Sequence, residues 1–143
     1  MAVMTFDPKR VIVTVNGVPI TGFADGDSAV VEYDEDAWTK TTGNDGDVCR
    51  TYQNRKGAKI TLRLMYGSPA NAILDTFAKL DAATKINPVA ILIKDTLGLS
   101  QAFARSAWLL KDPGMTVGRE PGDKEWVYDC AEVDIVHGPS LRV

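Results

Sequence analysis

The sequence of 143 residues is poor in the side chains that build most catalytic and metal sites. It contains one histidine, His137, and two cysteines, Cys49 and Cys130, that stand far apart in the chain. A usual zinc site takes four ligands from cysteine, histidine and carboxylate groups, so these residues predict none. A histidine-based triad would need His137 beside a nucleophile, and no nucleophile motif is present. We therefore expect no enzymatic activity, no metal and no cofactor.

Long hydrophobic runs and an excess of positive charge are also missing. The longest apolar runs, such as residues 90–93, are far shorter than the roughly 20 residues of a membrane helix. The first residues lack the basic and apolar segments of a secretory signal, so no export is expected, and both cysteines are expected to be free thiols, one of them in the core. A net charge of −3 argues against a generic nucleic-acid binder, which is normally basic.

The residues that are present predict one β-rich domain spanning residues 1–143. Apolar residues make up 45% of the chain and charged residues 24%, which is ordinary for a globular protein of this size. Residues 100–111 could form a helix by propensity, but their position between two turns favours a strand. Alternating apolar and polar residues predict strands at 9–16, 18–23, 28–34, 58–66, 89–96, 100–111 and 125–137.

A single helix is predicted at about 69–84. Ser68 is a good N-cap, and Pro69 fits the first helical position. An apolar stripe follows, made of Ile73, Leu74, Phe77 and Leu80. The fold class is therefore mainly β, an antiparallel β-sandwich or barrel with one flanking α-helix.

In the last predicted strand, simple alternation places the apolar residues on two opposite sides. One side is expected to hold Trp126, Tyr128 and Cys130, and the other Val127, Val133 and Ile135.

Residues 35–57 form a long polar loop between two predicted strands. Loops of this length are uncommon in compact domains and are usually functional or disordered. Trp38, Val48 and Tyr52 argue against disorder and are expected to anchor the loop. Two acidic clusters, one at 25–27 before this loop and one at 44–47 within it, resemble calcium loops only faintly, because no closing glutamate follows, and they are interpreted as turns.

The best candidate for nucleic-acid binding is a basic cluster in the second half of this loop and the start of the next strand, with Tyr52 inside it. The cluster consists of Arg50, Arg55, Lys56 and Lys59. Because Asp45 and Asp47 lie close by in the sequence, a charge-matched protein contact is the favoured interpretation.

Four segments, at 13–27, 43–58, 60–71 and 112–115, resemble in their order and spacing the tail tube proteins of contractile-tailed phages. The resemblance covers nearly the whole chain. It implies a β-sandwich with a flanking helix, six copies of which form a ring with a continuous inner β-barrel. Such rings stack into a hollow tube inside a contractile sheath, and DNA passes through the lumen.

The resemblance also implies partners and a location. The expected partners are further copies of the chain, the tail sheath protein, baseplate and tail terminator proteins, and viral DNA that passes without specific binding. No membrane insertion is expected. The location would be the virion tail, assembled in the host bacterial cytoplasm.

The loop would then be an arm that contacts a neighbouring subunit and the next ring, unless it folds back on its own subunit. The expected contact residues are Trp38, Asp45, Asp47, Val48, Arg50, Tyr52, Arg55 and Lys56. An acidic lumen would repel DNA, and its candidate lining residues are Glu32, Asp34, Glu132 and Asp134. They could instead be ordinary surface residues, or Lys59, Thr61 and Arg63 could line the lumen in their place.

Two other functions remain open from the sequence. A bacteriocin or secretion-system tube subunit would have the same plan as a phage tube. A monomeric β-sandwich binding module, for example for carbohydrate, would favour clustered aromatic residues on an open face. Trp38, Trp108 and Trp126 fall in separate segments and give that alternative little support.

Overall fold

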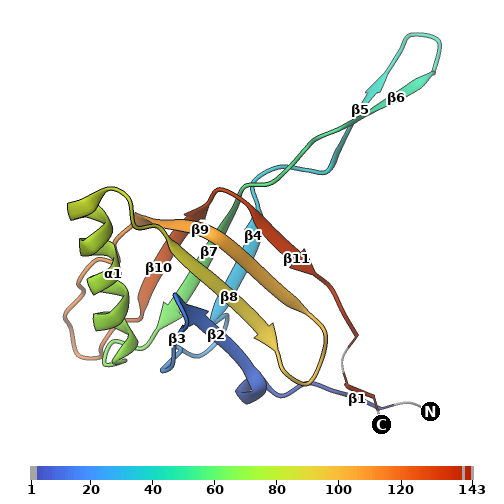
Figure 1. Ribbon diagram of the computed structural model, residues 1–143. Coiled ribbons are helices and arrows are strands. Elements are labelled where there is room, and N and C mark those ends of the chain that lie inside the picture. Colours follow the sequence, from blue (N-terminus) through green and yellow to red (C-terminus); the bar gives the residue numbers. More distant parts are fainter. Residues whose placement is uncertain (1–2, 140, 143) are drawn as a thin grey trace.

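A computed structural model describes residues 3–139 and 141–142 (Figure 1). Its elements are β1 (Met4–Thr5), the 3-10 helix η1 (Pro8–Arg10), β2 (Val11–Val15), β3 (Val18–Pro19), β4 (Ala29–Tyr33), β5 (Trp38–Thr42), β6 (Val48–Tyr52), β7 (Ala58–Leu64), α1 (Ala70–Thr84), β8 (Val89–Asp95), β9 (Gln101–Lys111), β10 (Lys124–Cys130), β11 (Val133–Val136) and β12 (Leu141–Arg142). The mainly β fold class with one α-helix is confirmed.

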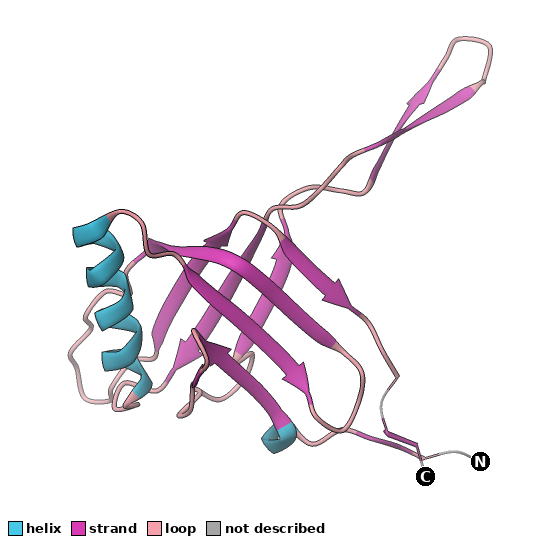
Figure 2. Ribbon diagram, in the orientation of Figure 1, coloured by secondary structure: helices cyan, strands magenta, loops and turns pink. Residues whose placement is uncertain are grey.

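The main sheet is antiparallel and follows the order β3-β2-β8-β9-β10-β7-β4, with β11 also paired to β9. Val15 of β2, Ile60 of β7 and Ile91 of β8 are fully buried in one cluster. Strands near both ends of the order thus share a core, so the sheet is folded over on itself (Figure 2). Within the described residues its two ends do not pair with each other, and the sheet is not a closed barrel.

The alternation predicted for residues 58–66 is present in β7. Its apolar residues, among them Ile60 and Leu62, have no exposed surface, while Lys59 is exposed on the other face. Each fully buried aliphatic side chain contributes roughly 1.5–3 kcal/mol. Residues 101–111 are a strand, as expected, and β9 lies between β8 and β10.

The last predicted strand is interrupted, and one of its predicted faces is wrong. β10 ends at Cys130 and β11 begins at Val133, and both pair with β9. The amide of Ala131 donates a hydrogen bond to the carbonyl of Ser106 in this break. Such irregularities change which side of a strand the following residues occupy. Val133 is therefore buried with Cys130 instead of lying opposite to it.

The strand predicted at residues 18–23 is much shorter in the structure, where β3 covers Val18–Pro19. After Pro19 the chain leaves β2 and crosses toward β7, where Phe23 bridges Leu64. Gly22 makes this crossing possible with a φ of +77°. A Cβ at this glycine would lie 2.5 Å from the Ser68 hydroxyl. The contact leaves no room for a side chain.

Helix α1 matches its predicted range closely. The Ser68 hydroxyl accepts a hydrogen bond from the Ala70 amide, and Lys85 ends the helix in the left-handed conformation. Leu74 is buried, but Leu80 is 49% exposed, so the predicted apolar stripe is too long. The indole of Trp126 donates to Asn71 at 3.0 Å and ties β10 to the helix.

Candidate functional site: the arm and the outer face of the sheet

Residues 35–57, here called the arm, project away from the sheet between β4 and β7 (Figure 1). The arm is a β-hairpin of β5 and β6, where the sequence predicts a loop without strands. Threonine and aromatic residues favour extended backbone, and a glycine-rich turn joins the two strands. In that turn the Gly43 amide donates to the Asp47 carbonyl at 2.8 Å, and Gly46 has a φ of +84°.

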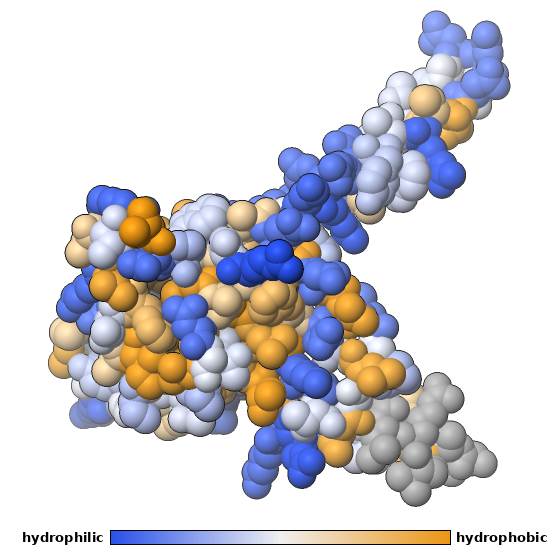
Figure 3. Space-filling view, viewed as in Figure 1, coloured by the Kyte–Doolittle hydropathy of each residue, from blue (hydrophilic) through white to orange (hydrophobic). Residues whose placement is uncertain are grey.

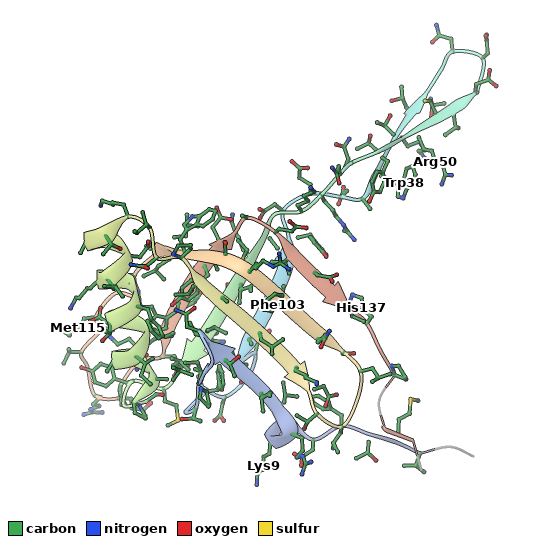
Figure 4. The ribbon with its side chains drawn as sticks, viewed as in Figure 1. Lys9, Trp38, Arg50, Phe103, Met115 and His137 are labelled. Atoms are coloured by element: carbon green, nitrogen blue, oxygen red, sulfur yellow. The ribbon has the colours of Figure 1, made fainter. Side chains whose placement is uncertain are left out.

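The hairpin has two different faces because opposite residues of an antiparallel pair point to the same side. Trp38 lies opposite Tyr52, and their ring centroids are 5.0 Å apart. The Arg50 guanidinium lies 4.3 Å from the centroid of the Trp38 ring, a cation–π contact (Figure 4). This face, called the aromatic face, consists of Trp38, Lys40, Thr42, Val48, Arg50 and Tyr52. The reverse face carries Thr39, Thr41, Cys49 and Thr51.

The aromatic face is uncovered. Every residue from 38 to 52 is exposed, and Trp38, Val48 and Tyr52 expose 48%, 61% and 60% of their surface. The arm therefore does not fold back on its own subunit. Large apolar side chains left in water on a projecting element are typical of a surface that binds another protein.

The predicted contact residues of the arm fall into three groups. Trp38, Val48, Arg50 and Tyr52 share the aromatic face, and Asp45 and Asp47 lie in the turn at the tip. Arg55 and Lys56 lie at the base of the arm, next to the sheet. There the Arg55 guanidinium lies 4.2 Å from the centroid of the Tyr33 ring, and the Lys56 carbonyl accepts from the Val133 amide. The base is thus fixed to the sheet, and the tip is free.

The predicted lumen residues lie on the outer face of the sheet or next to it, and all four are exposed. Glu32 is opposite Lys59, which is opposite Asp129 on the next strand. Arg63 is opposite Glu125 on the same face. The acidic residue Glu32 and the basic residues of β7 are therefore not alternatives, because they share one face of mixed charge. Asp134 in β11 also points outward, whereas Asp34 and Glu132 lie just beyond strand ends.

The sequence reasoning missed apolar residues on this outer face. In β9 the buried residues are small, such as Ala102 and Ala104, and the outward residue between them is Phe103. Phe103 is 39% exposed and lies opposite Leu92. Hydrophobic residues lie over this part of the molecule in Figure 3. The sequence of β9 contained a pattern that predicts this outer face, because small alanines alternate there with phenylalanine and arginine.

Across the described part of the chain, no group of three or more histidine, cysteine, aspartate or glutamate side chains is placed to hold a metal ion. No described helix is long and apolar enough to span a membrane. Cys49 is an exposed free thiol and Cys130 a buried one, as the sequence predicts.

A comparison with protein families decides the assignment. The model of the bacteriophage PhiTE tail tube protein family matches residues 12–138. The chain belongs to this family. Its role is that of a structural tube component of a phage tail.

The fold of this tail tube protein is also present in solved structures. A tube-terminating cap of the anti-feeding prophage is 16% identical, with a TM-score of 0.59 and coverage of 92% of this chain and 91% of that chain. Two structures come from the PVC extracellular contractile injection system. A chain of its extended sheath–tube complex is 15% identical (TM-score 0.63; 92% and 91% covered), and one of its sheath/tube terminator is 16% identical (TM-score 0.63; 93% and 97% covered). No curated protein sequence matches the chain.

Proposed function

We propose that this tail tube protein forms homohexameric rings that stack into a hollow conduit inside a contractile sheath. The observation that carries the proposal is the projecting hairpin, whose aromatic face is exposed along its whole length. A two-stranded hairpin is marginally stable in water by itself. A neighbouring copy that covers the aromatic face would stabilise an arm of this kind.

The free edges of the sheet support ring formation. Among the residues that the structure describes, β4 pairs with β7 on one side only, and the opposite end of the sheet is formed by β2 and the two-residue strand β3. Unpaired strand edges readily take up another strand. If β4 of one copy lies beside β2 of the next, the contact is head-to-tail and closes into a ring under cyclic symmetry. The sheets of six copies would then form one ring-wide inner barrel.

The outer face of the sheet would line the lumen. Lys59 of this face lies between Glu32 and Asp129, and Arg63 lies opposite Glu125. A surface binds DNA backbone through uncompensated lysine and arginine residues. Because Lys59 and Arg63 stand beside carboxylates, DNA could pass this part of the face without being held. Glu32, Asp34, Glu132 and Asp134 are the proposed lining residues.

Further partners and the location follow from the same proposal. Similarity to chains from a sheath–tube complex and a tube terminator supports contacts with a tail sheath protein and a terminator protein. A baseplate would nucleate the tube. Assembly would take place in the host cytoplasm, and the finished tube would be part of the virion.

Negative-stain imaging of the purified protein tests this proposal. We expect rings with sixfold symmetry and a central channel, and tubes at high protein concentration. A variant that lacks residues 41–47 should keep the circular dichroism of the wild type but form no tubes. Wild-type protein that stays monomeric at its highest soluble concentration would contradict the proposal.

The lumen assignment has its own test in assembled tails. Replacing Glu132 and Asp134 with lysine should slow DNA delivery and leave tube assembly intact. Delivery at the wild-type rate would remove these residues from the lumen.

A further inference from the structure

Tyr128 carries a buried polar group to which the fold gives no protein partner. Its side chain lies in the core beneath α1 and is 2% exposed. Among the described residues, its hydroxyl is the one buried side-chain oxygen or nitrogen that forms no hydrogen bond with the protein. Tyr33 shows the usual arrangement, because its hydroxyl donates to the Val133 carbonyl at 3.2 Å. A buried hydroxyl without any partner lowers stability, so such groups are normally satisfied by protein or by water.

Tyr128 borders a small cavity between α1 and the sheet. Phe77, Ala78 and Asp81 of α1 form one side of the lining. The other side consists of Asn87, Val89, Ala107, Trp108, Leu109 and Tyr128. The space that the centre of a water molecule can occupy in this cavity is about 10 Å³. A single buried water needs about that much room, so the size of the cavity selects water and excludes larger ligands.

The cavity is reached from the surface of the molecule. A groove of about 490 Å³ runs between α1 and the end of β9, and four residues line both the groove and the cavity: Ala78, Asp81, Trp108 and Leu109. Burial raises the pKa of the Tyr128 hydroxyl, and the negative charge of Asp112, which also lines the groove, raises it further. The groove gives solvent an entry path to the cavity.

The lining of the cavity also supplies polar groups that can hold a water. A buried water is typically bound by two to four polar partners. The Asp81 side chain is half-buried, and its Oδ1 accepts from the Asn87 amide at 3.2 Å. A carboxylate has lone pairs for further donors, and the side-chain carbonyl of Asn87 is another acceptor. A water there can accept from the Tyr128 hydroxyl and donate to these oxygens.

The end of α1 has little apolar surface that could hold it to the sheet. Near its start, Leu74 is buried and the bond from Trp126 to Asn71 ties the helix to β10. Leu80 is 49% exposed, and every residue from 82 to 84 is exposed. Asp81 is therefore the last side chain of α1 that turns toward the sheet, and it is polar.

These observations identify a binding site for one water molecule. We infer that a single buried water occupies the cavity and bridges the Tyr128 hydroxyl of β10 to the Asp81 carboxylate of α1. The water satisfies the buried hydroxyl, and the bridge holds the C-terminal part of α1 to the sheet. This site belongs to the subunit itself and does not depend on the proposed assembly.

A density map that resolves ordered water tests the site directly, in the free subunit or in assembled tubes. We expect a peak within hydrogen-bond distance of both the Tyr128 hydroxyl and an Asp81 carboxylate oxygen. An empty cavity would overturn the inference, and so would a Tyr128 hydroxyl bonded directly to the protein.

A double-mutant cycle tests the bridge in solution. Urea unfolding is measured for the wild type, Tyr128→Phe, Asp81→Ala and the double variant. Tyr128→Phe should lower the denaturant midpoint, whereas removal of an unbonded hydroxyl would raise it. The two substitutions together should cost less than the sum of the single losses, because each one breaks the same bridge. Asp81→Ala also removes the acceptor of the Asn87 amide, but that loss occurs in both backgrounds and cancels in the cycle.

Tyr33→Phe is the matched control, because it removes a hydroxyl that bonds directly to the Val133 carbonyl. Its effect should simply add to that of Asp81→Ala. Hydrogen exchange in the last turn of α1 should become faster in Tyr128→Phe and stay unchanged in Tyr33→Phe. The inference fails if the midpoint of Tyr128→Phe is unchanged or higher, or if the losses from Tyr128→Phe and Asp81→Ala are additive.

Discussion

The sheet and the arm are both antiparallel β-structure, yet they differ in what their side chains contact. β7 buries every second residue in the core, whereas β5 and β6 expose all of their residues on both faces. Burial of apolar surface is the main stabilising contribution to a fold. The sheet therefore has its own source of stability, and the arm depends on a few contacts within the hairpin. The comparison separates residues that fold the subunit from residues that are available for assembly.

The largest expected difference between the two regions is the cost of removing an apolar side chain. Leu62→Ala in β7 should lower the free energy of unfolding by about 2–5 kcal/mol, because it leaves a cavity in a fully buried site. Val48→Ala in the arm should change it by less than about 0.5 kcal/mol. Urea unfolding of both variants measures the two changes in the free energy of unfolding. Equal losses would mean that the arm belongs to the cooperative core.

Two glycines with similar backbone conformation offer a second comparison. Gly22 in the body and Gly46 in the arm have φ values of +77° and +84°. A Cβ at Gly22 would clash with Ser68, but nothing lies within 4 Å of one at Gly46. Gly22→Ala should lower the Tm by several degrees, whereas Gly46→Ala strains only the exposed turn of the arm and should leave the Tm nearly unchanged. A similar drop in both variants would show that backbone strain alone decides the effect.

Alkaline pH should lower the stability of the subunit through the buried thiol of Cys130. Burial raises the pKa of Cys130 to about 12 from an ordinary 9.0, and the charges of Asp129 and Asp34 add to the shift. The folded state holds this proton more tightly, so the stabilisation is complete below pH 9 and is lost as the pH rises toward 12. The loss is at most about 1.4 kcal/mol per pH unit.

Cysteine variants isolate the contribution of the Cys130 thiol to the pH dependence of stability. Cys130→Ala should make the decline of stability between pH 9 and 11 less steep, while Cys49→Ala should follow the wild type. Chemical denaturation at several pH values measures both slopes. An unchanged slope for Cys130→Ala would assign the alkaline effect to other groups, such as the buried hydroxyl of Tyr128, whose pKa is also raised by burial.

Loss of the aromatic pair of the arm should affect the hairpin locally and leave the global stability of the subunit unchanged. Trp38→Ala removes the contact with Tyr52 and the stacking of Arg50, which together hold the hairpin by roughly 0.5–1.5 kcal/mol. The global Tm should not change, but the tryptophan signal in near-ultraviolet circular dichroism should fall, and tubes should be lost. A clear drop in Tm would place Trp38 in the core.

Alternation in the sequence was sufficient to predict the buried strands and the helix. β7 and β9 lie where the pattern places them, and α1 differs by one residue from its predicted start. The break between β10 and β11 could not be predicted, because it depends on the hydrogen bond from Ala131 to the distant Ser106. This break also changes which face of the sheet the residues after Cys130 occupy.

The arm was predicted as a functional segment, but its strands were not. β5 has three threonines and β6 mixes polar and apolar residues, so no apolar alternation marks either face, and only the pairing of Trp38 with Tyr52 reveals the aromatic face. An apolar cavity of about 390 Å³, lined by Phe6, Val11, Val31, Ile93 and Ile135 among others, had no local signal in the sequence, because only the folded sheet brings these segments together.

Hydrogen exchange of the arm in free and assembled protein tests most directly whether the arm is an assembly element. In the free subunit, the amides of residues 38–52 should exchange far faster than those of β7. In stacked tubes, their exchange should slow by orders of magnitude, while exchange in β7 changes little. Arm amides that exchange equally fast in tubes and in free protein would contradict the account.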